Sequence, residues 1–129
     1  VMRYFAAPGK LELEIAAFCE KKKLCWALWP QMDRYDVEIQ FSDGDVWAID
    51  AKAYRNPIAL RAKIQNDGGF PSGDYARGYF VIPSEYTVNQ RNYTAIINRV
   101  LKDQKNVECV TLRALKTAIA KKEAMRSGE

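Results

Sequence analysis

Residues 36–41 and 46–54 each alternate between apolar and polar side chains, and a short polar breaker separates them. The apolar positions that share a face are Val37, Ile39 and Phe41 in the first run and Trp47, Ile49, Ala51 and Ala53 in the second. A period of two over runs of this length is typical of half-buried strands. The pattern therefore predicts a β-hairpin, and the fold must accommodate a sheet with this hairpin in it.

The breaker Ser-Asp-Gly predicts how the two strands pair. A three-residue loop with Gly44 in the left-handed conformation is a common hairpin closure, and it places Val37 opposite Ile49. A two-residue turn would set the apolar face of one strand against the polar face of the other, because a slip of one residue reverses every side chain. The register that keeps the apolar faces together also places Asp36 across from Asp50.

Asp36, Asp50 and Lys52 are thereby predicted to lie on one face. Opposed residues have Cβ atoms ~5 Å apart, and two carboxylates at that spacing repel each other unless a cation lies nearby. Such oxygen ligands suit Mg²⁺. The alternative is a solvated surface pair of Asp50 with Lys52, which would contribute little. We favour a site, because a middle strand of a helix-flanked sheet is buried, and unpaired charges there are unfavourable.

Composition limits the chemistry that is available. The 129 residues predict one domain over residues 1–129. A domain excised from a larger protein is an alternative that fits the same length. The chain has no histidine, which excludes His-based triads and His-ligated zinc. Its net charge of +4 weakly favours an anionic partner. Its three cysteines, without metal-site spacing, and the lack of a long apolar run predict a cytoplasmic protein with no membrane partner.

The remaining elements follow from periodicity and breakers. We expect helices over residues 10–23, from Pro57 onward, 87–105 and 115–125, and further strands over 24–29, 78–83 and 107–112, the first of them buried on both faces. Residues 66–74 predict a mobile loop, either a surface connection or a lid that presents Phe70 and Tyr75. The order predicts an α/β fold, with a mixed sheet of an antiparallel meander plus parallel strands flanked by helices.

This arrangement resembles the core of the PD-(D/E)xK, or restriction-endonuclease-like, nuclease superfamily. The matching residues are Asp36 in Tyr-Asp-Val-Glu-Ile and Asp50-Ala51-Lys52 in the second hairpin strand, with Tyr35 where the family name has Pro. A Glu on the preceding helix is similar to the acid of many members. We choose Glu14 for it, with Glu12 as the rival. Asp33 falls on the wrong face to replace Asp36, and Glu38 lies further from Lys52.

The resemblance implies a Mg²⁺- or Mn²⁺-dependent endodeoxyribonuclease that acts in restriction, defence or repair. Asp36, Asp50 and the carbonyl of Ala51 would hold the metal, while Lys52 and Glu14 would complete the catalytic set. Arg55, Arg61 and Lys63 would contact the backbone of DNA, which is preferred to RNA. The implied assembly is a homodimer or part of a larger protein or complex. Two alternatives are a catalytically inactive nuclease-fold module that binds nucleic acid or assembles a complex, and a general α/β interaction domain.

Overall fold

Five strands form one mixed sheet in the part of the chain that the computed structural model describes, residues 9–28 and 36–127. The strands are β1 (Cys25–Leu28), β2 (Val37–Gln40), β3 (Val46–Ala51), β4 (Arg77–Ile82) and β5 (Val107–Thr111). The helices are α1 (Lys10–Lys21), α3 (Pro57–Asn66), α4 (Tyr93–Val100), α5 (Leu112–Ser127) and the 3-10 helix η2 (Ser84–Thr87). None of the described helices is both long and apolar enough to span a membrane.

The strands lie in the order β1-β2-β3-β4-β5, which follows the sequence. β1, β2 and β3 pair antiparallel, whereas β3, β4 and β5 pair parallel. The parallel pairs need crossover connections, and α3 and α4 lie in those connections. The predicted α/β fold with a mixed sheet flanked by helices is therefore confirmed.

The predicted hairpin register is also confirmed. Val37 pairs with Ile49 and Ile39 with Trp47. The loop closes with Phe41 N–H donating to the carbonyl of Asp45 at 2.9 Å, and Gly44 has a φ of 96°. That φ lies in the left-handed region that favours glycine, so the bulged three-residue loop sets the pairing.

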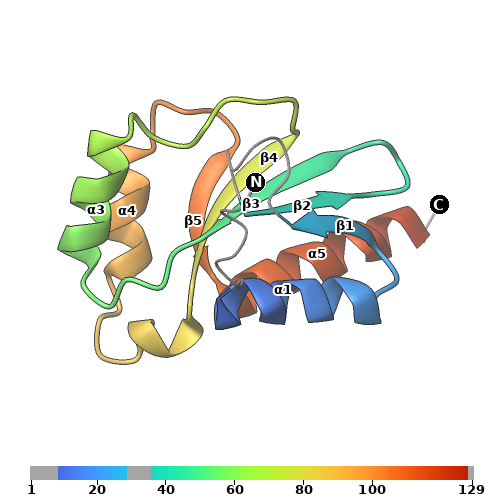
Figure 1. Ribbon diagram of the computed structural model, residues 1–129, viewed down its shortest axis with the longest axis horizontal. Helices are drawn as coiled ribbons and strands as arrows, with labels where there is room; N and C mark the ends of the chain where they lie inside the picture. Colours follow the sequence, from blue (N-terminus) through green and yellow to red (C-terminus); the bar gives the residue numbers. More distant parts are fainter. Residues whose placement is uncertain (1–8, 29–35, 128–129) are drawn as a thin grey trace, which may run out of the picture.

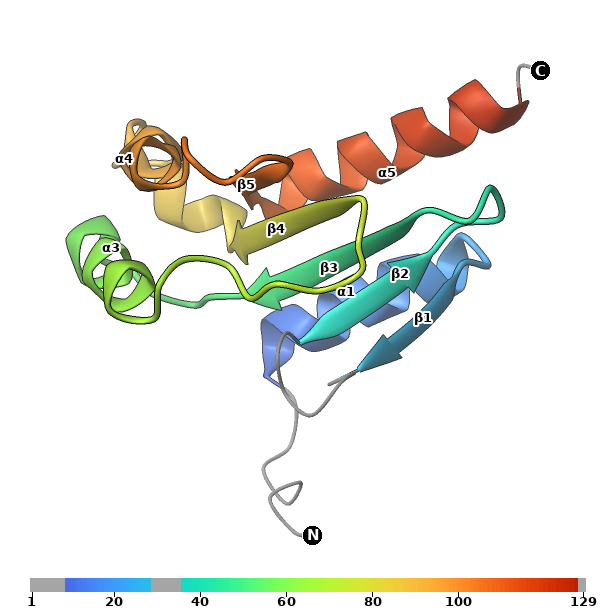
Figure 2. The same ribbon diagram turned by 90° about the horizontal axis from the view of Figure 1, so that it is seen from above.

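Alternation along the strands divides the core into two clusters, one on each face of the sheet. One face, which includes Trp47 and Ile49, packs against α1 and α5, and the other, which includes Ala48 and Phe80, packs against α3 and α4. Figure 1 shows α1 and α5 side by side along one face, and Figure 2 shows α3 and α4 at the end of the sheet near β4 and β5. β3 is in the middle, and its residues 47–50 are all buried.

The prediction that the first strand is buried on both faces was wrong. β1 is an edge strand, and its residues Cys25 and Ala27 are exposed. Only one face of β1 is covered, because α1 packs on that side. Trp26 is half-buried, and its indole N–H donates to Glu20 of α1 at 2.9 Å. The predicted strand end at Trp29 lies outside the described residues.

The helix predicted over residues 87–105 was wrong in extent. The chain forms η2 first, and α4 begins only at Tyr93 and ends at Val100. Before α4, the side-chain amide of Gln90 donates to the backbone carbonyls of Arg55 and Tyr86, at 2.9 and 3.0 Å, which favours a turn over a helix. After α4, Asn106 has a φ of 63°, which a continuing helix does not allow.

The 66–74 loop is anchored at Phe70, so the prediction of a lid that presents this residue was wrong. The Gln104 side chain bonds both the N–H and the carbonyl of Phe70, at 2.8 and 3.1 Å. The Phe70 ring is buried and meets the Phe80 ring edge-on at 4.9 Å. Tyr75 is half-buried, and its hydroxyl donates to the Pro71 carbonyl at 2.6 Å. Phe70 therefore belongs to the core.

Candidate active site

Asp36 lies directly before β2, and backbone bonds to β3 hold it in place. Its N–H donates to the carbonyl of Ile49 at 3.0 Å, and its Oδ2 accepts from the N–H of Ala51 at 2.8 Å. The side chain is therefore fixed by the same hairpin pairing that the Gly44 loop sets. A short carboxylate side chain held in this way has little freedom to move away from the end of β3.

Asp50 and Lys52 stand at the end of β3. Asp50 is 8% exposed, and Lys52 Nζ lies 3.3 Å from its Oδ1. The backbone N–H of Lys52 donates to the Val81 carbonyl at 2.8 Å, which extends the pairing with β4 past the end of the strand. Asp36 is close enough to donate a hydrogen bond to Asp50 when it is protonated. The structure thus brings Asp36, Asp50 and Lys52 together.

The charge in this group is unbalanced. Burial, followed by the negative charge of Asp50, raises the pKa of Asp36 from its ordinary 3.8 to about 7, although the Ala51 N–H and Lys52 oppose the shift. Two carboxylates, Asp50 buried and Asp36 half-buried, therefore share a single lysine, and a second cation would relieve their repulsion. We call Asp36, Asp50 and Lys52 the carboxylate–lysine cluster.

Glu12, rather than Glu14, is the acid on α1 that interacts with this cluster. Glu12 is half-buried, and its pKa is raised chiefly by burial, with a further contribution from the charge of Asp36 and an opposing one from Lys52. Glu14 is exposed and lines a separate hollow on α1. Residues two apart on a helix point in nearly opposite directions. The sequence favoured Glu14 with Glu12 as the rival, and in the structure Glu12 is the one whose charge interacts with the cluster.

The other rival acids have different placements. Asp33 lies outside the described residues. Glu38 is half-buried on β2, two residues beyond Asp36, with the Gln40 amide 3.4 Å from its Oε1. Asp36 is the acid whose electrostatic partners include both Asp50 and Lys52.

The chain that leaves the cluster is held by a segment far away in sequence. The Tyr93 hydroxyl donates to the carbonyl of Tyr54, and the Gln90 amide donates to the carbonyl of Arg55 at 2.9 Å. The two bonded residues are 39 positions apart in the first contact and 35 positions apart in the second. The sequence pattern contains no signal for them, because a side-chain bond to a distant backbone carbonyl leaves no periodicity. They fix the exit of β3 directly after Lys52.

The three residues predicted to bind nucleic acid lie after the cluster, in and before α3. Arg55 is exposed, and its guanidinium lies 5.2 Å from the centre of the Tyr86 ring. Arg61 is half-buried, and Lys63 forms an ion pair of 3.2 Å with Asp67. Lys63 thus has an exposed acidic partner at the C-terminal end of α3, while the contact of all three with nucleic acid stays a prediction.

The donor set of the cluster suits a hard divalent cation. Within residues 9–28 and 36–127 no group of three or more His, Cys, Asp or Glu side chains is arranged to hold a metal. Asp36 and Asp50 provide two carboxylates, and Mg²⁺ is commonly bound by one or two carboxylates with waters and phosphate oxygens in its other positions. A bound cation would also offset the burial and the charge of Asp50 that raise the pKa of Asp36. Ala51 ends β3 beside them, and its carbonyl as a ligand stays a prediction.

The fold and the site define a class: an α/β domain with a mixed sheet and a partly buried carboxylate–lysine cluster at the end of its central strand. The model of the family described as "REase associating with pPIWI_RE" matches residues 9–127, and the chain belongs to this restriction-endonuclease-related family. Neither the curated proteins nor the solved structures contain a match.

Proposed function

We propose that this domain is a metal-dependent nuclease of the PD-(D/E)xK type that hydrolyses phosphodiester bonds in DNA, in a restriction, defence or repair setting. The observation that carries the proposal is the pair of half-buried Asp36 and buried Asp50, which shares one lysine; partial burial and the charge of Asp50 raise the pKa of Asp36 to about 7. The restriction-endonuclease-related family supports the same reading.

Each residue has a role that its position supports. Asp36 and Asp50 would hold Mg²⁺ or Mn²⁺, and the carbonyl of Ala51 would assist. When bound, the metal would neutralise phosphate charge and make water a better nucleophile. Lys52, 3.3 Å from Asp50, would orient the attacking water and stabilise negative charge that develops on the phosphate. Glu12 would reach the same site from α1, because its charge already interacts with Asp36 and Lys52.

The direct test is cleavage of plasmid and linear DNA in Mg²⁺ or Mn²⁺, with an RNA of the same sequence alongside. Asp50→Ala and Lys52→Ala should each abolish cleavage. Asp45→Ala is the matched control, because Asp45 is also an aspartate paired with a lysine, at 2.7 Å from Lys122, but lies at the other end of the hairpin. Cleavage that survives both changes at the cluster would refute the proposed site.

The second candidate is a non-catalytic module that binds nucleic acid or assembles with a partner. The family description favours it in one respect, because it names an association with pPIWI_RE. DNA binding that weakens with salt, without cutting in any divalent metal, would support this candidate over the first. Size measurement by light scattering would separate a homodimer from a monomer that acts only within a larger complex.

A further inference from the structure

A hollow of about 340 Å³ lies between the first turns of α1 and α5. Its lining residues are Lys10, Glu14, Pro83, Ser84, Glu85, Leu112, Arg113 and Lys116. They come from α1, from the start of α5 and from the chain that leaves β4. We call it the α1–α5 hollow. It plays no part in the chemistry assigned above.

The α1–α5 hollow lies at the same end of the sheet as the carboxylate–lysine cluster. Pro83 and Ser84 follow the end of β4, which pairs in parallel with the end of β3 through Ala51 and Val81. Figure 1 shows the start of α1, the start of α5 and the end of β4 gathered at this end. α1 joins the two places, because Glu12 interacts with the cluster while Lys10 and Glu14, four residues apart, line the hollow.

Three cations line the hollow, against two carboxylates. Lys10, Arg113 and Lys116 form no ion pair within 4 Å with any residue of the described chain. Lys116 Nζ instead lies 5.5 Å from the centre of the Phe18 ring. The Ser84 hydroxyl accepts from the Arg113 N–H at 2.9 Å, which ties the start of α5 to the exit of β4. Unneutralised cations beside a hydroxyl in one hollow are suited to an anion.

We propose that the α1–α5 hollow binds a backbone phosphate of the nucleic-acid strand whose cleavage is assigned to the cluster. The inference rests on the proposed function. Lysine, arginine and serine are the usual partners of phosphate oxygens, and such contacts set the register of a nucleic acid on a protein. A phosphate held here would position the strand along the first turns of α1, at the end of the sheet that carries Asp36 and Asp50. Glu14 and Glu85 limit the affinity of the hollow for free anions.

The test measures the affinity of a fluorescent DNA duplex by anisotropy in Mg²⁺, in an Asp50→Asn background that should bind without cutting. Lys10→Gln and Arg113→Gln are the variants, because neither removes the ring contact of Lys116 or the backbone bond of Arg113. Lys105→Gln is the matched control, since Lys105 is exposed and precedes β5 at the opposite end of the sheet. A thermal melt of each variant verifies folding.

We expect the Lys10→Gln/Arg113→Gln double variant to bind about tenfold more weakly at low salt, with a salt dependence reduced by about two counterions. Lys105→Gln should bind like the parent. An unchanged affinity in the double variant, or an equal loss in the control, would overturn this inference. Cleavage by the protein that keeps Asp50 tests the proposed function separately. The proposed function and the phosphate-binding inference can therefore each fail alone. An acidic peptide measured in the same assay is a second ligand. If the double variant loses binding to this peptide but not to DNA, the inference is overturned in favour of a protein partner.

Discussion

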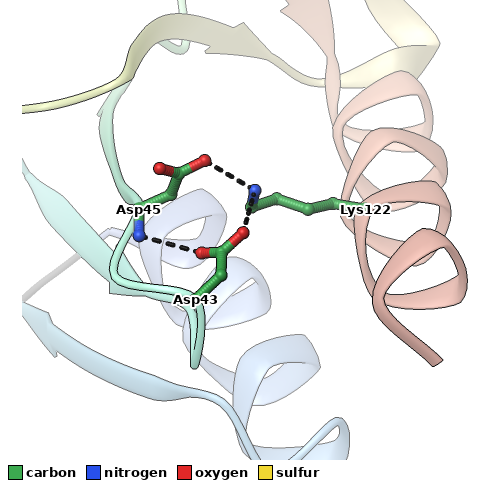
Figure 3. A network of polar contacts seen from close by, with 3 residues as sticks. All are labelled: Asp43, Asp45 and Lys122. Carbon is green, nitrogen blue, oxygen red and sulfur yellow. Dashed lines mark hydrogen bonds and ion pairs between the residues drawn. The ribbon is translucent and has the colours of Figure 1, made fainter. Parts of the chain in front are cut away.

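The two ends of the β2–β3 hairpin each carry two aspartates and a lysine, but the charges are arranged differently. At the turn, Lys122 Nζ lies 3.0 Å from Asp43 and 2.7 Å from Asp45. Figure 3 shows the lysine reaching both carboxylates. These aspartate side chains are 38% and 46% exposed. The lysine also lies over the rings of Phe41 and Trp47. One cation thus bonds both acids where water still reaches them.

At the open end of the hairpin, Lys52 contacts Asp50 at 3.3 Å, and the Asp50 side chain is 12% exposed. Asp36 obtains its hydrogen bond from the Ala51 N–H instead, and its pKa is raised to about 7. The same set of two aspartates and one lysine therefore forms an exposed clasp at the turn, where the lysine contacts both acids, and a more buried group at the sheet end, where the lysine contacts Asp50 alone. The difference indicates that residue type alone does not mark a site. Burial does, together with whether the cation contacts both carboxylates or only one of them.

The largest expected contrast is between the two lysines. Lys52→Gln should lower DNA cleavage by about 100- to 1,000-fold, because it removes the cation that would stabilise charge at the reacting phosphate. Lys122→Gln, the same chemical change at the turn, should leave the cleavage rate per folded molecule unchanged. Initial rates on a plasmid substrate measure both. Equal losses in the two variants would mean that the two ends are not different in function.

Metal binding should separate the aspartates in the same way. Mn²⁺ at one hundred times its dissociation constant should stabilise the protein by about 2.7 kcal/mol, because it binds the folded cluster and not the unfolded chain. Asp50→Asn should lose this stabilisation, whereas Asp45→Asn should keep it. Thermal unfolding with and without Mn²⁺ provides the measurement. Metal stabilisation that persists in Asp50→Asn would place the ion elsewhere.

The raised pKa of Asp36 predicts how stability depends on pH. Since the folded pKa of about 7 exceeds the ordinary 3.8, the stability from protonated Asp36 is complete below about pH 4 and is lost as the pH rises through 7. Asp36→Asn keeps an oxygen for the Ala51 N–H but cannot ionise. Its stability relative to the parent should therefore increase by about 2 kcal/mol between pH 4 and pH 8 without metal. Urea unfolding at both pH values tests this. A constant difference would contradict it.

The acids on α1 provide a smaller contrast. Glu12→Gln should lower cleavage about tenfold, because Glu12 supports the cluster from the side. Glu14→Gln should have a smaller effect, since Glu14 is exposed and lines the α1–α5 hollow. The cleavage rates of the two variants in Mg²⁺ decide between the acids. A greater loss with Glu14→Gln would restore the choice made from the sequence.

The placement of Asp36, Asp50 and Lys52 was predictable from the sequence as far as local patterns determine it. Val37, Ile49 and the Gly44 loop fix the register, and the register places Asp36 beside Asp50. The distinction between Glu12 and Glu14 was not predictable, because it depends on the rotation of α1 against the sheet. Both residues satisfy the helical pattern equally.

Other errors arose where long-range contacts override local pattern. The apolar run over residues 24–29 predicts a strand buried on both faces. β1 nevertheless lies at the edge of the sheet and exposes Cys25 and Ala27. The predicted helix over residues 87–105 was shortened by the contacts of Gln90 with backbone carbonyls. The α1–α5 hollow joins Lys10 and Arg113, which are too far apart in the chain for any periodicity to connect them.

The smallest expected effect is the stability contribution of the turn clasp. Lys122→Gln should lower the free energy of unfolding by about 1 kcal/mol, because it leaves Asp43 and Asp45 without their shared cation in a partly exposed place. Raising the salt concentration should shrink this difference, since screening weakens the ion pairs and the repulsion alike. Urea unfolding at 0.05 and 1 M NaCl would measure the change. A loss that does not depend on salt would assign the contribution of Lys122 to its packing over Phe41 and Trp47 instead.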